Sequence, residues 1–399
     1  MITLANGRVV TARSLLTPGW VTVDRGLIAD VGSGEPAATR RRAAGVVVDL
    51  AGAHLLPGFV DLHMHGGGGA QVTTDDPEEI RAAVAFHRRH GTTRTLASLV
   101  TDRLDRMVAA AAAVAALIRA GESRIAGIHL EGPFLNPARR GSHHAEYLLA
   151  PDPAALARLL DAGAGSVRVV TLAPELPGGA ALLADVVRAG AIAAVGHTEA
   201  TYAQARDAFA GGARLATHLF NAMRAFHHRD PGPAGAALAD ERVTCELIND
   251  GVHVHDQVVR LAVAAAGADR IAFVTDATPA AGMASGEYRL GPVPITARGD
   301  TVTLADGTLA GSTLTMDATV RHAVRRVGLP LVAVAAAAAT TPARLLGLGE
   351  RTGSIAPGKE ADLVVLDEEL RLRAVIAGGA LVHGALPGYD DRPAAPPAA

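Results

Sequence analysis

The stretch GFVDLHMHGGGGA, residues 58–70, joins an apolar run to two histidines and four consecutive glycines. Side chains alternate between two faces of a β-strand, so His63 and His65 share a face with Phe59 and Asp61. Two imidazoles on one face could hold a metal ion, and the glycines allow a sharp turn directly afterwards. Because His-x-His is a weak motif and barrel histidines often have structural roles, this stretch alone leaves both interpretations open.

Seven further strand-length apolar runs follow this one, separated by longer segments with a helical Ala/Leu/Arg pattern. This alternation predicts βα units around a parallel sheet. Eight such units predict an α/β protein with a TIM-type (β/α)8 barrel, whose active site would lie at the C-terminal strand ends. The eight runs are residues 58–65, 93–98, 125–132, 167–175, 191–198, 214–223, 243–250 and 271–277.

Both ends of the chain have a different sequence pattern, with short runs of alternating apolar and polar residues broken by Gly and Asn. We expect residues 1–53 and 350–387 to pair into one small β-sandwich domain. Residues 54–349 would then form the barrel, with a β insertion near residues 285–311. The Pro- and Ala-rich residues 388–399 are predicted to be a disordered tail.

Composition excludes several classes of partner. The formal net charge is −3 and the arginines are scattered, so we expect neither a nucleic-acid nor a membrane partner. The most apolar run, residues 107–118, is too short to cross a bilayer, and residues 1–10 lack the pattern of a secretion signal. Cys245 is the only cysteine, which excludes an internal disulfide and fits a reducing compartment. We therefore expect a cytoplasmic protein.

Polar residues at other predicted strand ends change the interpretation of the histidine pair. Glu131 ends the third run, His197 and His218 end the fifth and sixth, and Asp276 ends the eighth. Each residue alone has an ordinary explanation, but all of them would meet at one rim of the barrel. Imidazoles with a carboxylate suit Zn²⁺ or Fe²⁺. The pattern therefore favours a divalent metal site that activates water for hydrolysis.

Longer motifs carry a family resemblance over nearly the whole chain. They are PGFVDLHMHG, HLEGPF, GHTEA, THLFNAM, DGVHVH, VTDAT, GSTLTM and GSIAPGKEADLVVLD. With them the chain resembles the amidohydrolase superfamily and, through HLEGPF together with THLFNAM, its N-acetylglucosamine-6-phosphate deacetylase family. The resemblance implies a (β/α)8 barrel with a small β-sandwich built from both termini.

The resemblance also implies a ligand set. In many superfamily members a carbamylated lysine bridges two metal ions, but the single lysine here, Lys359, lies near the C-terminus outside the predicted barrel. Glu131 is the natural replacement. The family pattern implies two ions per subunit, Zn or Fe: a core ion held by Glu131, His197 and His218, and a second held with the help of His63 and His65.

The implied reaction is removal of the acetyl group from N-acetylglucosamine 6-phosphate, giving glucosamine 6-phosphate and acetate. Asp276 matches the family's acid/base, which would take a proton from metal-activated water and return it to the sugar amine. Arg229 would reach the phosphate bound by a neighbouring subunit, which implies a homodimer. The residues matching other contacts with the amino-sugar phosphate are Ser142, His143, Asn221, Ala222, His253, Ala310 and Gly311.

Two alternatives stay open at this point. Another amidohydrolase could act on a different N-acyl sugar phosphate or a cyclic amide, although the missing bridging lysine argues against most of these enzymes. A metal-free barrel could serve as a scaffold, but such a protein should have lost its ligands, and all of them are present. For the substrate contacts, an ordinary role as loop residues is a further alternative.

Overall fold

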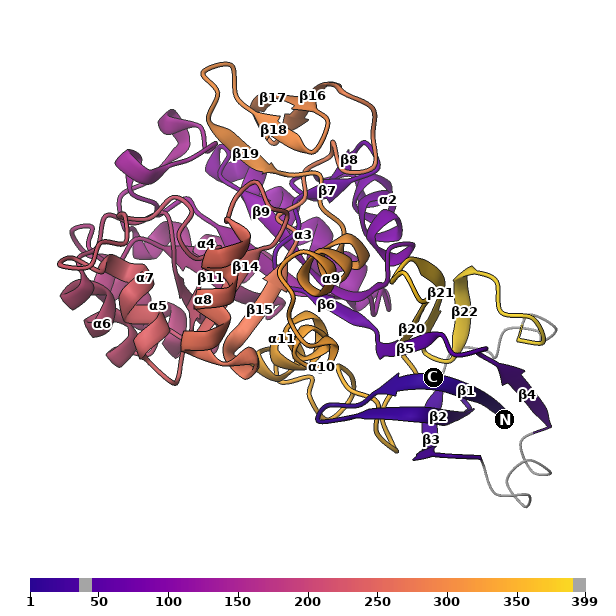
Figure 1. The fold of residues 1–399 in the computed structure, drawn as a ribbon. Coiled ribbons are helices and arrows are strands. Elements are labelled where there is room, and N and C mark those ends of the chain that lie inside the picture. The colour runs from indigo at the N-terminus through magenta and orange to yellow at the C-terminus, as the bar shows by residue number, and fades with distance from the viewer. Residues whose placement is uncertain (36–44, 390–399) are drawn as a thin grey trace. The chain divides into compact units, whose positions relative to one another are not determined.

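The computed structural model describes residues 1–35 and 45–389, so nearly all of the predicted tail lies outside the described residues. The chain divides into two compact units (Figure 1). One contains Met1–Val60, His87–Thr93 and the residues from Met316 onward. The other contains Asp61–Phe86 and Arg94–Thr315, and it carries all the predicted site residues.

An eight-stranded sheet, most of it in the second unit, has its strands arranged in chain order. Every pair from β9 to β15 is parallel. A parallel bridge between Met64 and Ala277 joins the segments that follow the first and last strands, so the ring nearly closes. This confirms the predicted TIM-type barrel. The strands are β6 (Phe59–Asp61), β9 (Thr92–Val100), β10 (Ile125–Glu131), β11 (Val167–Leu172), β12 (Ile192–Val195), β13 (Leu215–Ala216), β14 (Thr244–Ile248) and β15 (Ile271–Val274).

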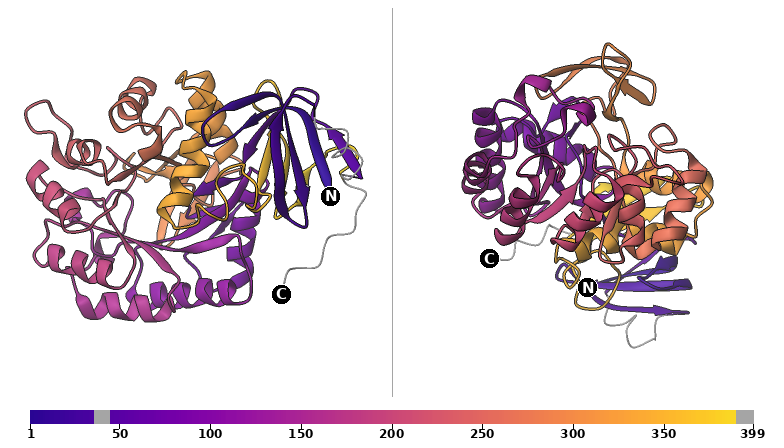
Figure 2. Two further views of the ribbon diagram at one scale, coloured as in Figure 1. Left: turned by 90° about the horizontal axis from the view of Figure 1, so that it is seen from below. Right: turned by 90° about the vertical axis from the view of Figure 1, so that its left-hand side faces the viewer.

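Helices lie outside the barrel strands (Figure 2). Each buries one apolar face, as α5 does with Leu182, Leu183 and Val186. Among the described residues, no helix is both long and apolar enough to cross a membrane. The helices of this unit are α2 (Pro77–Arg88), α3 (Leu104–Arg119), α4 (Pro153–Ala162), α5 (Gly179–Arg188), α6 (Tyr202–Ala210), α7 (Gly232–Ala239) and α8 (Asp256–Ala266), with 3₁₀ turns η1 (Pro137–Arg139), η2 (Ala145–Tyr147) and η3 (Ala268–Arg270).

An antiparallel excursion follows β15, at the top of Figure 1. It consists of β16 (Gly286–Leu290), β17 (Val293–Arg298), β18 (Thr301–Thr303) and β19 (Leu309–Ser312). Its small apolar core includes Val100 from the end of β9. The backbone N–H of Gly291 also donates to Gln71 of the short hairpin β7 (Gly66–Gly67) and β8 (Ala70–Gln71) at 3.0 Å. The excursion is therefore anchored at the C-terminal end of the barrel, where the predicted site lies.

The first unit contains a second eight-stranded sheet formed from both termini, as predicted. Strand β5 links the two ends, since it pairs with β1 from the N-terminus and with β20 from the C-terminus. Apolar residues from both ends share one core. The strands are β1 (Ile2–Val10), β2 (Leu15–Asp24), β3 (Leu27–Ser33), β4 (Val46–Asp49), β5 (His54–Pro57), β20 (Leu363–Leu366), β21 (Leu372–Ala377) and β22 (Ala380–Gly384). The unit also contains α9 (Met316–Arg325), α10 (Leu331–Ala335), the π-helical η4 (Ala336–Thr340) and α11 (Thr341–Leu345).

Candidate active site

Six of the predicted site residues leave the barrel strands at the same end, and all six are buried. Glu131 is the last residue of β10. The other positions repeat a simple spacing, with one site residue two positions after the end of each of four strands. These residues are His63 after β6, His197 after β12, His218 after β13 and Asp276 after β15, while His65 follows His63 by two positions.

The backbone turns sharply at three of these positions. His197, His218 and Asp276 have positive φ angles of 48°, 29° and 48°, a conformation that costs about 1–3 kcal/mol for a residue with a side chain. At Asp276 the turn is held from both sides, by donation of its N–H to the His63 carbonyl and by donation to its own carbonyl from Ser312, each at 2.8 Å. At Asp276, these two hydrogen bonds therefore hold the residue in a strained backbone conformation.

Glu131 lies at the centre of the cluster. Its Oε1 is 3.1 Å from Nε2 of His197 and 3.0 Å from Nε2 of His218, and these two nitrogens are 3.0 Å apart. The same Oε1 is 3.3 Å from Nε2 of His63, and Oε2 is 3.2 Å from Nε2 of His65. The structure therefore brings together all five residues predicted as metal ligands.

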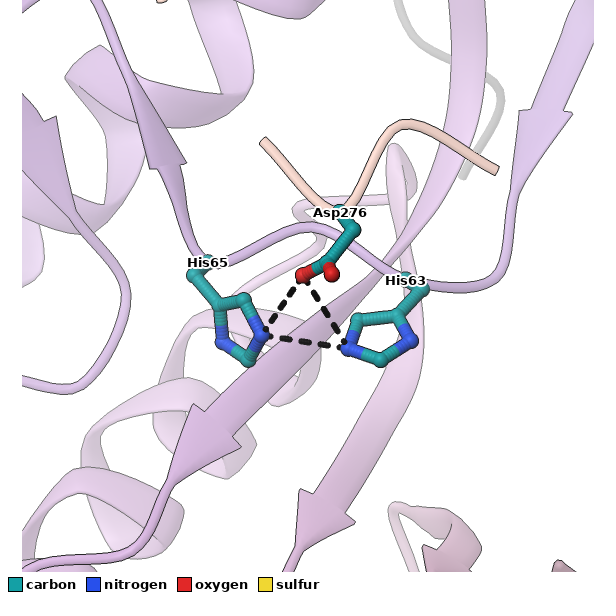
Figure 3. Close-up of side chains that lie close together, drawn as sticks. All are labelled: His63, His65 and Asp276. Atoms are coloured by element: carbon teal, nitrogen blue, oxygen red, sulfur yellow. Dashed lines mark hydrogen bonds and ion pairs between the residues drawn. The ribbon is translucent and has the colours of Figure 1, made fainter. Parts of the chain in front are cut away.

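A second group forms beside Glu131. His63, His65 and Asp276 point toward one another (Figure 3). The two Nε2 atoms are 3.1 Å apart, and Oδ1 of Asp276 is 3.2 Å from that of His65 and 3.6 Å from that of His63. These three residues and a second trio, Glu131, His143 and His197, each offer ligand atoms within 4.8 Å of one another.

The outer nitrogens of the rings indicate which atom each histidine presents to the centre. Nδ1 of His65 lies 2.8 Å from the carbonyl oxygen of Ser98, and Nδ1 of His197 lies 2.8 Å from that of Arg139. A carbonyl oxygen only accepts hydrogen bonds, so each Nδ1 must carry the proton. In the neutral form of each ring, Nε2 then offers a lone pair toward the centre, as a metal-binding imidazole does.

His143 has the opposite orientation. Its Nδ1 lies 2.8 Å from the hydroxyl of Thr101 and 3.3 Å from the backbone nitrogen of Thr101. The backbone N–H can only donate, so Nδ1 is an acceptor and the proton of the neutral ring lies on Nε2. That Nε2 is 3.2 Å from Oε2 of Glu131. His143 therefore acts as a hydrogen-bond donor in the site, which distinguishes it from the histidines that present lone pairs.

The donor set fits a divalent cation. Lone pairs of neighbouring imidazoles would face one another and the Glu131 carboxylate at about 3 Å, which is unfavourable unless positive charge lies between them. The same separation is close to the distance between adjacent ligands around an ion with bonds of about 2 Å. The residues present, imidazoles with carboxylates, are those that bind such ions in proteins.

The pKa shifts indicate the same demand for positive charge. Burial lowers the pKa of His63 and His65, but the neighbouring carboxylates outweigh it, raising that of His63 well above its usual value and that of His65 to about 9. Burial raises the pKa values of Glu131 and Asp276, but the charge of His63 brings both below their usual range. Burial lowers the pKa of His197 to about 4. Both carboxylates are thus ionised and His197 is neutral, whereas His65 holds a second proton that a bound cation would replace.

A cavity of about 360 Å³ opens onto this cluster. Glu131 and Asp276 line it, and so do six of the predicted substrate contacts: Ser142, His143, Asn221, Ala222, His253 and Gly311. Gly311 has a φ of +64°, and a Cβ there would lie 2.7 Å from the Asp276 carbonyl oxygen, so this close approach requires glycine. Ala310 is instead buried in the core of the excursion.

Six lining residues were missed by the sequence analysis: Ala138, Arg139, Gly141, Leu290, Thr308 and Leu309. Ala138 and Arg139 belong to the 3₁₀ turn η1, and Gly141 follows it. The other three come from the excursion, whose β pattern was visible in the sequence although its position over the barrel was not. None of the six follows a barrel strand directly, so the strand-end argument could not find them.

Arg229 lies apart from the cavity. Its side chain does not line the cavity, and its guanidinium is exposed and 2.8 Å from Nε2 of His228. The loop is shaped by mutual backbone hydrogen bonds between His227 and Asp230. Arg224 reinforces it by donating two hydrogen bonds to the carboxylate of Asp230 at 2.6 and 2.9 Å.

A parallel barrel with imidazoles and carboxylates gathered at the C-terminal ends of its strands defines a class of protein, the barrels that bind divalent metal ions. The model of the amidohydrolase family matches residues 54–382. The chain belongs to this family.

Individual relatives are similar over nearly their whole length. An N-acetylglucosamine-6-phosphate deacetylase from Bacillus subtilis (strain 168) is 34% identical, with 93% of this chain and 94% of the relative covered. An N-acetylgalactosamine-6-phosphate deacetylase from Escherichia coli O157:H7 is 35% identical, with 94% and 98% covered. Among solved structures, an aspartate-to-alanine mutant of N-acetyl-D-glucosamine-6-phosphate deacetylase from Mycobacterium smegmatis, in complex with N-acetyl-D-glucosamine-6-phosphate, is 44% identical with a TM-score of 0.90, covering 96% of this chain and 99% of that one.

Proposed function

We propose that this protein hydrolyses the acetamide of N-acetylglucosamine 6-phosphate, releasing acetate and glucosamine 6-phosphate. The observation that carries the proposal is the position of Asp276, an ionised carboxylate facing the cavity beside imidazoles that present lone pairs. This arrangement supplies a proton acceptor next to a place for a metal ion. The similarity to deacetylases of 6-phosphorylated N-acetylhexosamines supports the choice of substrate.

Two divalent ions per subunit, zinc or iron, suit the residues around Glu131. Glu131, His197 and His218 would hold a core ion, and His63 and His65 would help to hold a second. Such ions polarise a carbonyl and make a bound water more acidic. Metal analysis of the His63→Ala/His65→Ala double variant tests the second site, because the variant should keep its fold and lose close to one metal equivalent. An unfolded variant, or an unchanged metal content, would favour a structural role for the pair.

Two side chains of the protein would assist the reaction, Asp276 by transferring protons and His143 by donating a hydrogen bond. Asp276 would accept the proton of the attacking water and later deliver it to the nitrogen of the leaving amine. His143 presents its Nε2 proton to the cavity, so it would donate to the acetyl oxygen as negative charge develops there. Ser142, Asn221, Ala222, His253 and Gly311 of β19 would position the sugar phosphate.

The phosphate needs a countercharge, and we propose that Arg229 supplies it across a homodimer. The arginine is exposed, does not line the cavity of its own subunit and sits on a loop reinforced by Arg224 and Asp230. Guanidinium donors match the geometry of phosphate oxygens. Mixing Arg229→Ala subunits with Asp276→Asn subunits tests the sharing, because each hybrid dimer would contain one complete site. If exchange of subunits restores no activity at low substrate concentration, the arginine does not act in trans.

The decisive experiment for the reaction is amine release from N-acetylglucosamine 6-phosphate, measured beside unphosphorylated N-acetylglucosamine and with and without a chelator. We expect activity on the phosphorylated sugar that the chelator abolishes and added metal restores. Activity that survives complete metal removal would contradict the proposal. If a cyclic amide is hydrolysed faster than either sugar, another amidohydrolase activity replaces it.

A second candidate substrate is N-acetylgalactosamine 6-phosphate. The relative from Escherichia coli O157:H7, an N-acetylgalactosamine-6-phosphate deacetylase, favours this substrate. Its identity to this chain, 35%, is as high as that of the N-acetylglucosamine-6-phosphate deacetylase from Bacillus subtilis (strain 168), 34%. The two substrates differ only at one hydroxyl of the sugar ring, so a ratio of kcat/KM values for the pair decides between them.

A further inference from the structure

Glu246 is a fully buried carboxylate in the middle of β14, inside the barrel and outside the lining of the cavity. Its Oε2 lies 3.2 Å from Nδ1 of His63 and accepts the backbone N–H of His218 at 3.1 Å. Its Oε1 has no hydrogen-bond partner within the described protein. One oxygen of Glu246 thus contacts one residue from each of the two proposed metal sites, His63 and His218.

Glu246 makes the environment of His63 different from that of the other rings. The outer nitrogens of His65 and His197 face backbone carbonyl oxygens, whereas Nδ1 of His63 faces a carboxylate. A carboxylate oxygen at this position accepts the Nδ1 proton, and this contact orients the opposite nitrogen as a ligand and makes it more basic. His63 therefore receives both its orientation and its basicity from this contact.

Packing alone cannot choose which nitrogen of His63 faces the centre. The ring lies edge-on to His129, with centroids 4.6 Å apart, and stacks on His218 at 5.4 Å. A flipped imidazole has nearly the same shape, so these contacts would tolerate it. His129 offers no hydrogen bond to His63, because its two nitrogens lie within hydrogen-bond distance of the hydroxyls of Ser98 and Thr171.

We propose that Glu246 is a positioning residue that holds His63 with Nδ1 protonated and Nε2 directed at the second metal ion. By accepting the His218 N–H on the same oxygen, it also ties the second site to the core site. The proposal rests on the second metal site proposed above. It does not depend on which acetylated sugar is the substrate.

The test measures metal binding rather than turnover. Metal-stripped wild-type protein and its variants are dialysed to equilibrium against buffered zinc(II), and bound zinc is measured at each free concentration. We expect Glu246→Leu to weaken binding of the second equivalent by about tenfold to a hundredfold, the usual cost of losing a residue that orients a ligand. Glu246→Gln should recover most of that affinity, because an amide oxygen can still accept both N–H groups.

Asp61→Asn is the matched control. Asp61 is also a buried carboxylate beside His63, but it accepts the backbone N–H of His63 at 3.1 Å rather than a ring N–H. We expect this variant to bind both equivalents with near wild-type affinity. Equal weakening in Asp61→Asn and Glu246→Leu would show a general loss of structure and overturn the proposal.

The remaining outcomes distinguish a failure of the role of Glu246 from a failure of the second metal site on which that role depends. Wild-type protein that takes up a single zinc equivalent would refute the second site itself, and the role of Glu246 with it. Two equivalents in wild type with an unaltered second affinity in Glu246→Leu would refute only the role of Glu246. If Glu246→Leu does not fold, nitrogen NMR of histidine-labelled wild-type protein decides, since a His63 signal with the proton on Nε2 would overturn the proposal.

Discussion

Replacing Asp276 with asparagine separates the proton-transfer role of this side chain from its shape. Oδ1 of Asp276 lies 3.2 Å from Nε2 of His65, and the backbone is fixed by hydrogen bonds to His63 and from Ser312. An asparagine can occupy the same space and still offer one oxygen to the histidines. It has no carboxylate to accept a proton, so the variant removes the base and leaves the site's geometry in place.

The size of the effect follows from the proposed role. A positioned general base contributes about a hundredfold to ten-thousandfold in rate, which corresponds to about 3–5 kcal/mol of transition-state stabilisation. Asp276 is ionised and lines the cavity. Among the described residues, the only other carboxylate in that lining is Glu131. Glu131 is surrounded by imidazole nitrogens and could not replace it. We therefore expect kcat to fall by the full amount and KM to change little.

The assay compares steady-state amine release by wild-type protein and Asp276→Asn, with bound metal measured on the same samples. Asp61→Asn serves as the control, because Asp61 is a buried carboxylate that bonds to Thr275 and the backbone of His63 without lining the cavity. A kcat for Asp276→Asn close to that of the control, with metal content intact, would refute the acid/base assignment. A loss of metal that accounts for the loss of rate would show that Asp276 acts as a ligand instead.

Three further predictions follow from the site and its surroundings. Glu131→Gln should remove the anionic ligand, so dialysed protein should lose its core metal equivalent and nearly all turnover; normal metal content by elemental analysis would contradict this. Arg229→Ala should raise KM for the phosphorylated sugar by about tenfold to a hundredfold, the worth of a charge-assisted hydrogen bond, and equal losses on unphosphorylated substrate would argue against a phosphate contact. Burial lowers the pKa of His253, but its hydrogen bond to Asp250 raises it overall, and the pairing lowers the pKa of Asp250 against the effect of burial. The stability from this pair is therefore complete between the usual pKa values of the two groups, and it is lost as pH falls through the folded pKa of Asp250 or rises through that of His253. The melting temperature of Asp250→Asn should accordingly fall furthest below wild type near about pH 5–6, and a deficit that does not change with pH would contradict the ion pair.

The barrel could be predicted because its strands are apolar on both faces and are separated by helical segments. The strand ends could not be placed from the same pattern. The sixth run was predicted over residues 214–223, but β13 contains only Leu215–Ala216. The reason lies in the site itself, since His218, Phe220 and Ala222 all adopt positive φ angles. Hydrophobic periodicity carries no information about such turns.

The candidate ligands were predictable for a related reason. Parallel strands end on one rim, so residues far apart in sequence can be brought together by topology alone. His143 was identified by resemblance, but its proton position depends on the N–H of Thr101, which no sequence pattern shows. Glu246 lies in mid-strand, where alternation marks it only as inward-facing. Its role depends on contacts across the barrel with His63 and His218.

The position of Glu131 would allow it to take the place of a metal-bridging carbamylated lysine. The single lysine of the chain, Lys359, belongs to the other unit, where its Nζ donates to the Gly349 carbonyl and to Ser354. A carbamylated lysine would provide two oxygens and one negative charge between two ions, and a glutamate provides the same. In this chain Oε1 of Glu131 lies near His197 and Oε2 lies near His65, so the carboxylate is close to both groups of candidate ligands. The glutamate reaches the centre from the end of β10 on a shorter side chain and needs no covalent modification to carry its charge. In the two-ion site proposed above, Glu131 would therefore both replace the bridge and join the two groups, so its loss should affect both sites and the loss of His63 and His65 only one.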